Sequence, residues 1–323
     1  RDRSVSRGLG DVYKRQVLYN VKNIAIFQVD IYIGSGEQLI VWDKYGKFKR
    51  VLSKKGNDPQ SYLHFNHFMI WPNGDLSIAS PIEIVTYSNS HQFINKKRCE
   101  NVGYIEAITL LNDSLYIIKC MPTPEQLRYR IINHHTGAII NSYDSIINCN
   151  RYISSFTNSF ERYEGHIISH GYQSNDILEC TLDSSKIRYK INVDNRIPPA
   201  GFYTQEGKEG MQLIQEEAEK GYIGHIPDYV ESKETILLSF KGKREDLNGI
   251  ALIDKKDGNA RVLENIKFDD NFRWLPKQFF SLDEGWCAML MYPEDVLKKE
   301  EFARRFPGLD EESNPVLFIG KLR

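Results

Sequence analysis

The segment HFMIWPNGDLSIAS, residues 67–80, contains the pattern that decides the fold. Two short runs of apolar and aromatic residues flank a Pro-Asn-Gly-Asp turn, which is the arrangement expected of a β-hairpin. The next segment, IEIVTYSNSHQFINKK at residues 82–97, has the same form, with two strand-length runs around a Ser-Asn-Ser turn. Together the two segments predict one sheet of four antiparallel strands.

The same cycle of four runs recurs along the chain. Before it lie KNIAIFQ, DIYIGS, QLIVWD and KFKRVLS, between residues 22 and 53. After it come EAITLLNDSLYIIKC with RYRIINHHTGAIINSY, ISSFTNSFERYEGHIISHG with DILECTLDSSKIRYKINV, GHIPDYVESKETILLSF with NGIALIDKKDGNARVLENI, and KQFFSLDEGWCAMLMY with NPVLFIGKLR. Turns between first and second strands are expected near Asp30, Asn73, Asp113, Glu164, Lys233 and Asp283. Turns between third and fourth strands are expected near Gly46, Asn89, Gly137, Ser184 and Gly258.

The spacing of these turns is about 40 to 50 residues, which is the range of propeller repeats. Six cycles therefore predict an all-β fold, a six-bladed β-propeller of four-stranded antiparallel blades. A parallel βαβ fold would need a helix after nearly every strand, and the pattern lacks such helices.

The two ends of the chain bear on how the ring closes. The sixth cycle has three strands, and a strand from the other end usually completes such a blade because closure removes an exposed edge. VLYN, residues 17–20, is the remnant expected of that strand, so we expect the last blade to be incompletely closed. Residues 1–16, RDRSVSRGLGDVYKRQ, closely resemble the translation of a sequencing-library adapter, the alternative being a flexible basic tail. We expect residues 1–16 to be a non-native or disordered head, and residues 17–323 to form one domain whose native amino terminus and export signal are missing.

Two segments have helical rather than strand periodicity. In Gly207–Gly221, Met211, Ile214 and Ala218 share one face. In Tyr292–Gly308, Pro293 stands at the start and two arginines stand near the end, an order that suits the helix dipole. The first segment precedes blade five and the second lies between the second and third strands of blade six.

Strand alternation places these insertions on one face of the disk. The turns between first and second strands, and between third and fourth strands, share the opposite face and are short. Because rigid strands hold variable loops in place, elaboration of one face usually indicates the binding face. The alternative is that the insertions only cap the channel.

Seven residues on the elaborated face are candidate ligand contacts. An exposed aromatic ring beside an arginine suits stacking on a sugar or peptide and pairing with a carboxylate. The alternative for each residue is packing at a junction between blades. The candidates are Tyr62, His64, Arg151, Tyr152, Tyr172, Arg273 and Trp274.

Composition excludes several classes of protein. The net charge of −1 gives no electrostatic basis for binding nucleic acid. No apolar run approaches the roughly 20 residues needed to span a bilayer.

The five cysteines are scattered singly and are expected in the core. His166 and His170 would lie about 13 Å apart on a strand, too far to chelate one ion, and no nucleophile elbow, P-loop or zincin motif occurs. We predict no metal, no cofactor and no catalytic residue.

One stretch resembles a known group of proteins. VWDKYGKFKRVLSKKGNDPQSY, residues 41–62, is similar to the first blade of six-bladed NHL- and TolB-like propellers of Bacteroides-type bacteria. The matching residues are Asp43, Lys44, Gly46, Lys47, Phe48, Gly56, Pro59 and Tyr62, whereas Asp58 and Ser61 replace the Gly and Glu of that pattern. The ending NPVLFIGKLR resembles the closing strand of the group. The resemblance implies export to the periplasm or cell envelope, often as a lipoprotein, without an established activity.

The sequence leaves three functions open. The leading hypothesis is a non-catalytic envelope binding module that recognises a glycan, peptide or protein through the elaborated face. The second is a metal-dependent lactonase-like hydrolase or a lyase at the mouth of the central channel, and the third is a structural assembly part. Three or four oxygen or nitrogen ligands at about 2.0–2.6 Å from one point in the channel would favour the enzyme.

Overall fold

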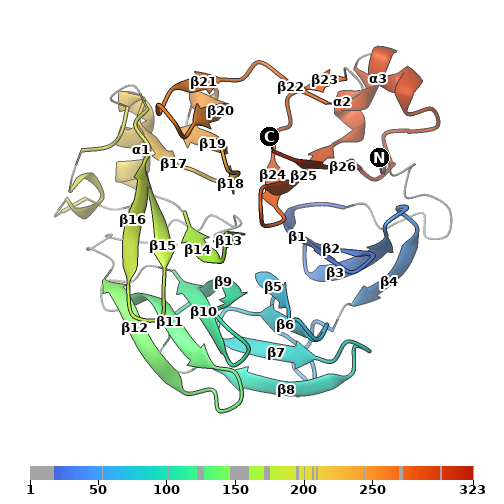
Figure 1. The fold of residues 1–323 in the computed structure, drawn as a ribbon, viewed down its shortest axis with the longest axis vertical. Coiled ribbons are helices and arrows are strands. Elements are labelled where there is room, and N and C mark those ends of the chain that lie inside the picture. Colours follow the sequence, from blue (N-terminus) through green and yellow to red (C-terminus); the bar gives the residue numbers. More distant parts are fainter. Residues whose placement is uncertain are drawn as a thin grey trace.

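The computed structural model contains six antiparallel sheets arranged around a central axis (Figure 1). It describes residues 18–52, 54–99, 102–121, 127–145, 160–170, 175–193, 196–199, 201–205, 207–208, 210–242, 244–268, 272–298 and 300–322. The head predicted at residues 1–16 and the segment 146–159 lie outside these residues. The six-bladed propeller expected from the repeated turns is confirmed.

The first three blades have four strands each. Blade one contains β1 (Val21–Phe27), β2 (Asp30–Ser35), β3 (Gln38–Asp43) and β4 (Phe48–Leu52). Blade two contains β5 (His67–Ile70), β6 (Leu76–Ala79), β7 (Glu83–Tyr87) and β8 (Phe93–Arg98). Blade three contains β9 (Ile105–Leu110), β10 (Leu115–Cys120), β11 (Leu127–Asn133) and β12 (Ile139–Ser145).

The last three blades are less regular. Blade four contains β13 (Phe160–Tyr163), β14 (His166–Ser169), β15 (Asp176–Cys180) and β16 (Ser185–Lys190). Blade five contains β17 (Ile223–His225), β18 (Tyr229–Glu231), β19 (Thr235–Gly242), β20 (Asn248–Asp254) and β21 (Ala260–Val262). Blade six contains β24 (Phe279–Ser281), β25 (Trp286–Met291) and β26 (Val316–Lys321). In blade five β17 and β18 both pair with β19, so its innermost strand is interrupted between His225 and Tyr229.

The remaining elements belong to the connections. A two-stranded hairpin joins blades five and six, and the described helices precede blade five or follow β25. These elements are β22 (Ile266–Lys267), β23 (Arg273–Trp274), α1 (Gly210–Lys220), α2 (Pro293–Leu297), α3 (Glu300–Arg305), and the single 3-10 turns η1 (Phe202–Thr204) and η2 (Glu245–Leu247). The sequence predicts one helix over Tyr292–Gly308, whereas the structure has α2 and α3 as two short helices there. None of the helices within the described residues is long and apolar enough to span a bilayer.

The turns predicted from Gly, Asn and Asp residues lie where strands reverse. In blade two the Gly74 N–H donates to the Trp71 carbonyl at 2.8 Å, and Gly74 has a φ of +86°. A residue with a side chain rarely adopts this conformation, which explains the glycine. The connections of this kind are two to five residues long and lie on one face of the disk, here called the turn face. The longer connections, with α1, α2, α3 and the β22–β23 hairpin, lie on the opposite face, here called the loop face.

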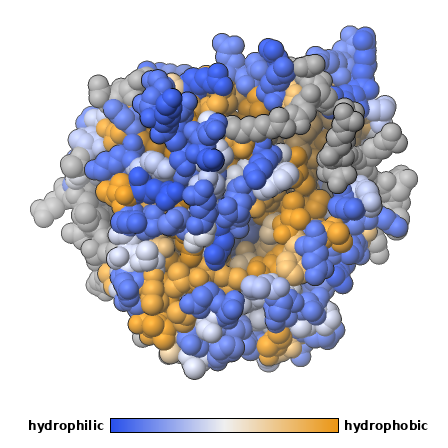
Figure 2. All heavy atoms as spheres, in the orientation of Figure 1, coloured by the Kyte–Doolittle hydropathy of each residue, from blue (hydrophilic) through white to orange (hydrophobic). Residues whose placement is uncertain are grey.

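The core consists of six apolar clusters, one at each junction between neighbouring blades. Successive residues of a strand point to opposite sides of the sheet, so each middle strand supplies two clusters. In β10, Tyr116 and Ile118 pack toward blade two, whereas Ile117 packs toward blade four. Burial on both sides is why these strands read as continuous apolar runs. Figure 2 shows that the disk face itself is mainly hydrophilic, with apolar atoms visible between polar groups toward the centre.

Polar side chains also join blades one to five, each to the next, around the innermost strands. Asn23 donates to the Phe68 carbonyl at 3.1 Å, and Asn66 donates to the Ile105 carbonyl at 2.7 Å. Farther round, Lys119 donates to the His170 carbonyl at 2.7 Å, and His170 Nδ1 lies 3.0 Å from the Ile226 carbonyl. Each bond crosses one junction and satisfies a backbone carbonyl at the end of a strand. These bonds therefore fix neighbouring blades near the central axis.

Blade six meets blade one through an apolar cluster and a polar contact. Leu18 and Val21 are buried against β24, β25 and β26. The Leu18 N–H donates to Asn314 Oδ1 at 2.8 Å. Within the described residues blade six has three strands, as the sequence predicted for an incompletely closed last blade. Figure 1 shows β1 next to β24 of this blade.

Candidate functional site

The structure describes four of the seven candidate contact residues. Tyr62 and His64 lie on the loop face between blades one and two, and Arg273 and Trp274 form β23. Arg151, Tyr152 and Tyr172 lie outside the described residues. The four described candidates therefore form two separate groups, which have different environments.

Tyr62 and His64 both contact Glu37. The Tyr62 hydroxyl donates to the Glu37 carbonyl at 2.8 Å, and His64 Nδ1 lies 3.6 Å from Glu37 Oε2. Lys22 and Lys55 lie 3.8 Å and 3.6 Å from the same carboxylate. Tyr62 is fully buried, whereas the His64 side chain is 57% exposed. Of the two, only the His64 side chain is exposed, whereas Tyr62 holds the Glu37 turn in position.

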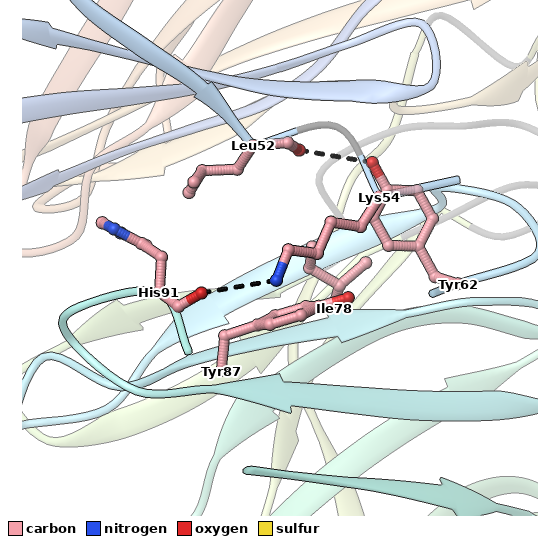
Figure 3. A pocket seen from close by; sticks show the side chains of 6 residues that line it. All are labelled: Leu52, Lys54, Tyr62, Ile78, Tyr87 and His91. Carbon is pink, nitrogen blue, oxygen red and sulfur yellow. Dashed lines mark hydrogen bonds between the residues drawn. The ribbon is translucent and has the colours of Figure 1, made fainter. Parts of the chain in front are cut away.

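Figure 3 shows the junction beneath Tyr62. Tyr62 and Tyr87 face each other across a void of about 10 Å³, which is room for about one water molecule. Lys54 Nζ lies 4.9 Å from the centre of the Tyr87 ring, a cation–π contact, and Lys54 also donates to the His91 carbonyl at 3.5 Å. Burial lowers the pKa of His91 to about 4, so the ring is neutral near pH 7. This void is too small for a ligand, and its lining serves the packing of blade one on blade two.

Arg273 and Trp274 line a larger pocket on the loop face. Its volume is about 420 Å³, within the range typical of small-molecule sites. One wall is the β22–β23 hairpin and the segment after it, and the other is α2 with the start of α3. The lining residues are Glu264, Asn265, Arg273, Trp274, Leu275, Lys277, Asp295, Lys298 and Phe302. We refer to this cavity as the hairpin pocket.

The walls of the hairpin pocket rest on the apolar junction between blades five and six. Trp274 pairs with Ile266 across the hairpin, and its ring lies 5.6 Å from that of Phe318 in β26. Phe302 of α3 packs on Phe272, with ring centres 4.9 Å apart. These aromatic contacts hold the hairpin against the helices of blade six, which Figure 1 shows side by side. Aromatic packing therefore joins the two walls of the pocket.

Charge is distributed unevenly around the hairpin pocket. Lys277 lies 3.2 Å from Glu294 and 3.0 Å from Asp295 of α2. The hydrogen bond to Asp295 raises the pKa of Lys277, so this lysine is charged and already paired. The side chains of Arg273 and Lys298 are exposed and make no ion pair or hydrogen bond with the described part of the chain. The pocket therefore presents two available cations.

Sequence reasoning identified Arg273 and Trp274 but not the residues that face them. Asp295 and Lys298 belong to an insertion whose position over the hairpin depends on tertiary packing. Glu264 and Asn265 precede the hairpin in a segment without a recognisable motif. The sequence does show acidic residues in the first turn of the Tyr292–Gly308 insertion. Such residues alone do not indicate which other segment of the chain they face.

Buried charges elsewhere have structural partners. Glu231 is fully buried, and its carboxylate accepts from Arg188 at 2.9 and 3.0 Å, Lys255 at 2.6 Å and Tyr229 at 2.9 Å. The Arg162 N–H donates to Asp283 at 2.8 Å, joining the turns of blades four and six on the turn face. Among the described residues, no three His, Cys, Asp or Glu side chains gather as a metal site. The hairpin pocket is thus the candidate functional site.

The fold and the pocket define the class of protein, a six-bladed β-propeller with an elaborated loop face. The family described as Domain of unknown function (DUF4934) matches residues 14–321, and the chain belongs to that family. No curated protein matches the chain. The resemblance to NHL- and TolB-like propellers stays a prediction.

Two solved structures from Bacteroides species share the fold. A presumed exported protein of Bacteroides fragilis has a TM-score of 0.77 at 12% identity, covering 99% of this chain and 95% of that one. A member of the duf4221 family from Bacteroides vulgatus has a TM-score of 0.59 at 9% identity, covering 99% of this chain and 98% of that one. At these identities the similarity establishes the propeller architecture.

Proposed function

We propose that the protein is a non-catalytic binding module of the cell envelope that recognises its partner, a glycan or peptide, through the loop face. The observation that carries this proposal is the hairpin pocket, which combines a volume of about 420 Å³ with two available cations. Pockets that combine an apolar wall with a few fixed polar groups are typical of ligand sites. The walls are insertions relative to the bare blades, as expected for a binding face on a repeat scaffold.

The position of His64 supports a broader contact surface on the same face. His64 is exposed beside the Glu37 turn, and its own backbone is fixed, since its N–H donates to Ser80 Oγ at 3.2 Å. Arg151, Tyr152 and Tyr172 remain proposed contacts. Export is proposed from the resemblance in the first blade and from the description of the Bacteroides fragilis relative.

The test is to block each face of the disk separately. Lys298→Cys places a thiol on the loop face, and Lys256→Cys places one in the turn between β20 and β21 on the turn face. Both changes are made in a Cys99→Ser, Cys149→Ser background and the thiol is coupled to a maleimide polymer. Burial raises the pKa of Cys287 to about 12 and encloses Cys120 and Cys180, so these thiols stay unreactive.

The labelled proteins are then applied to glycan and peptide arrays. Binding by the unlabelled protein that is lost on labelling at position 298 and kept on labelling at position 256 supports the proposal. Equal binding by both labelled forms would show that the loop face is not the recognition surface. Cell fractionation with the native gene tests export, and recovery only in the cytoplasm would contradict an envelope location.

A further inference from the structure

We propose that the hairpin pocket takes a singly charged carboxylate ligand that also bears hydroxyl groups, the chemistry of an acidic sugar. This inference rests on the proposed function and adds the class of ligand. It is argued from the arrangement of charge, of hydrogen-bonding groups and of apolar surface in the pocket.

The first step is the positive charge near Arg273. In the hairpin Lys267 lies directly opposite Arg273, so the two side chains project from the same side of the two strands. Like charges in this position repel each other, and neither side chain is paired within the described residues. An anion beside Arg273 would relieve this repulsion. Asp269 and Asp270, in the connection between the two strands, lie outside the described residues.

The second step is the number of charges that the ligand carries. Arg273 and Lys298 are available, whereas Lys277 is already held by Glu294 and Asp295. Glu264 also lines the pocket, exposed and without an ion pair in the described chain. The lining charges of Arg273, Lys298 and Glu264 leave one net positive charge, since Lys277 is paired with Asp295, so a single carboxylate matches the pocket better than a dianion such as a phosphate monoester.

The third step is the uncharged part of the ligand. Glu264 and Asn265 lie on the lip before the hairpin and offer oxygen acceptors, with the Asn265 amide also a donor. Hydroxyl groups can donate to both acceptors. The half-buried Leu275 supplies apolar surface on the wall, next to the largely buried rings of Trp274 and Phe302 that also line the pocket. A sugar ring has an apolar face and hydroxylated edges, so it matches this combination better than an aliphatic acid, which has no hydroxyl group to donate to these acceptors.

The experiment uses a matched pair of ligands. Binding of the methyl glycoside of galacturonic acid, which carries one carboxylate, and of its methyl ester is measured by calorimetry at low ionic strength, because the two share shape and hydroxyl groups and differ in charge. The wild-type protein is expected to bind the acid at least about tenfold more tightly than the ester, since charge-assisted hydrogen bonds are lost with the ester. Raising the salt concentration should weaken binding of the acid and leave binding of the ester nearly unchanged.

Three variants locate the effect. Arg273→Gln and Lys298→Gln are each expected to weaken binding of the acid about tenfold or more, with little effect on the ester. Lys256→Gln removes the same unit of charge from the turn face and is expected to bind as the wild type does. Far-ultraviolet circular dichroism and thermal unfolding confirm that each variant is folded.

Several results would overturn the inference. Equal binding of acid and ester, lost in a Leu275→Glu variant, would keep the pocket as a binding site and remove the role of charge. Binding of acidic peptides without binding of any acidic sugar would remove the sugar assignment. Acid binding that survives in both Arg273→Gln and Lys298→Gln would place the site elsewhere. The blocking experiment on the two faces remains a separate test of the proposed function.

Discussion

Replacement of Asp228 by Asn is expected to remove a large pH dependence of stability. Asp228 is buried where the innermost strand of blade five is interrupted. Its carboxylate accepts from the Ser239 hydroxyl at 2.7 Å and from the Phe279 N–H of blade six. Burial outweighs these hydrogen bonds and nearby Lys241, and raises the pKa of Asp228 from 3.8 to about 7.

The direction of the effect follows from the two pKa values. Between pH 4 and pH 7 the folded protein holds a proton on Asp228 that the unfolded chain has released. The free energy of unfolding therefore falls as pH rises through this window, and the contribution present at low pH is lost above pH 7. Since one pKa unit corresponds to about 1.36 kcal/mol, the full change is about 4 kcal/mol. In Asp228→Asn the side chain is neutral at every pH, so the variant does not lose this part of its free energy of unfolding as pH rises.

The assay is urea unfolding at intervals from pH 4 to pH 8 for the wild type and for Asp228→Asn. The difference between the free energies of unfolding of variant and wild type should grow by about 4 kcal/mol over this range. The substitution can also change the free energy of unfolding by a constant amount, for example by weakening the hydrogen bond to Ser239. Such a constant shifts the variant's values equally at every pH and leaves the pH-dependent increase of the difference unchanged. Asp246→Asn serves as a control, because the exposed Asp246 is paired with Arg244, which lowers its pKa and gives any pH dependence the opposite sign. Curves for Asp228→Asn and wild type that stay parallel within about 1 kcal/mol would refute the reasoning.

Three further predictions concern other buried groups. Glu231→Gln should lower the free energy of unfolding by about 3–5 kcal/mol, because it removes the buried carboxylate that pairs with Lys255 and leaves Arg188 with Glu179 as its remaining counter-charge, whereas Arg304→Ala at an exposed pair should cost less than about 1 kcal/mol; equal effects in urea unfolding would contradict this. Gly34→Ala should lower the free energy of unfolding by about 1–3 kcal/mol, because a Cβ atom there would lie 2.6 Å from the Phe65 ring. Phe65→Leu should reduce this loss, and an unchanged loss in the double variant would argue against the clash. Burial lowers the pKa of His170 to about 3, so nuclear magnetic resonance should show a neutral ring in the folded protein at pH 5, and the contribution of His170 to the free energy of unfolding should be lost as pH falls from about 6.5 toward 3; a protonated ring at pH 5 would contradict the buried placement.

The repeated architecture could be predicted because its signals are local. Turn residues such as Asn73 and Gly74 act within their own hairpin, and the apolar runs around them are complete in a few residues. The interruption between β17 and β18 was not predicted, because His225 and Tyr229 belong to one run in the sequence. That interruption depends on partners in other blades, including the bond from Phe279 to Asp228.

The candidate site was predicted only in part for a related reason. Arg273 and Trp274 are adjacent in the sequence and could be recognised as a pair. Their counterpart Lys298 is brought opposite them by the packing of Phe302 on Phe272, which is a contact between distant segments. Ion pairing could not be predicted from the sequence either. Only the fold shows that Lys277 pairs with Asp295, whereas Arg273 has no ion pair with the described residues.

The division of each middle strand between two apolar clusters has a consequence for how substitutions combine. Ile117 and Ile118 are neighbours in the chain, yet they belong to different junctions and share few packing partners. Their replacement should therefore have nearly additive effects on stability, whereas Ile118 and Tyr116 face one junction and should be coupled. In this propeller, epistasis between core positions follows a period of two along the strand, and the constraints on one side of a blade can change while those on the other side are preserved.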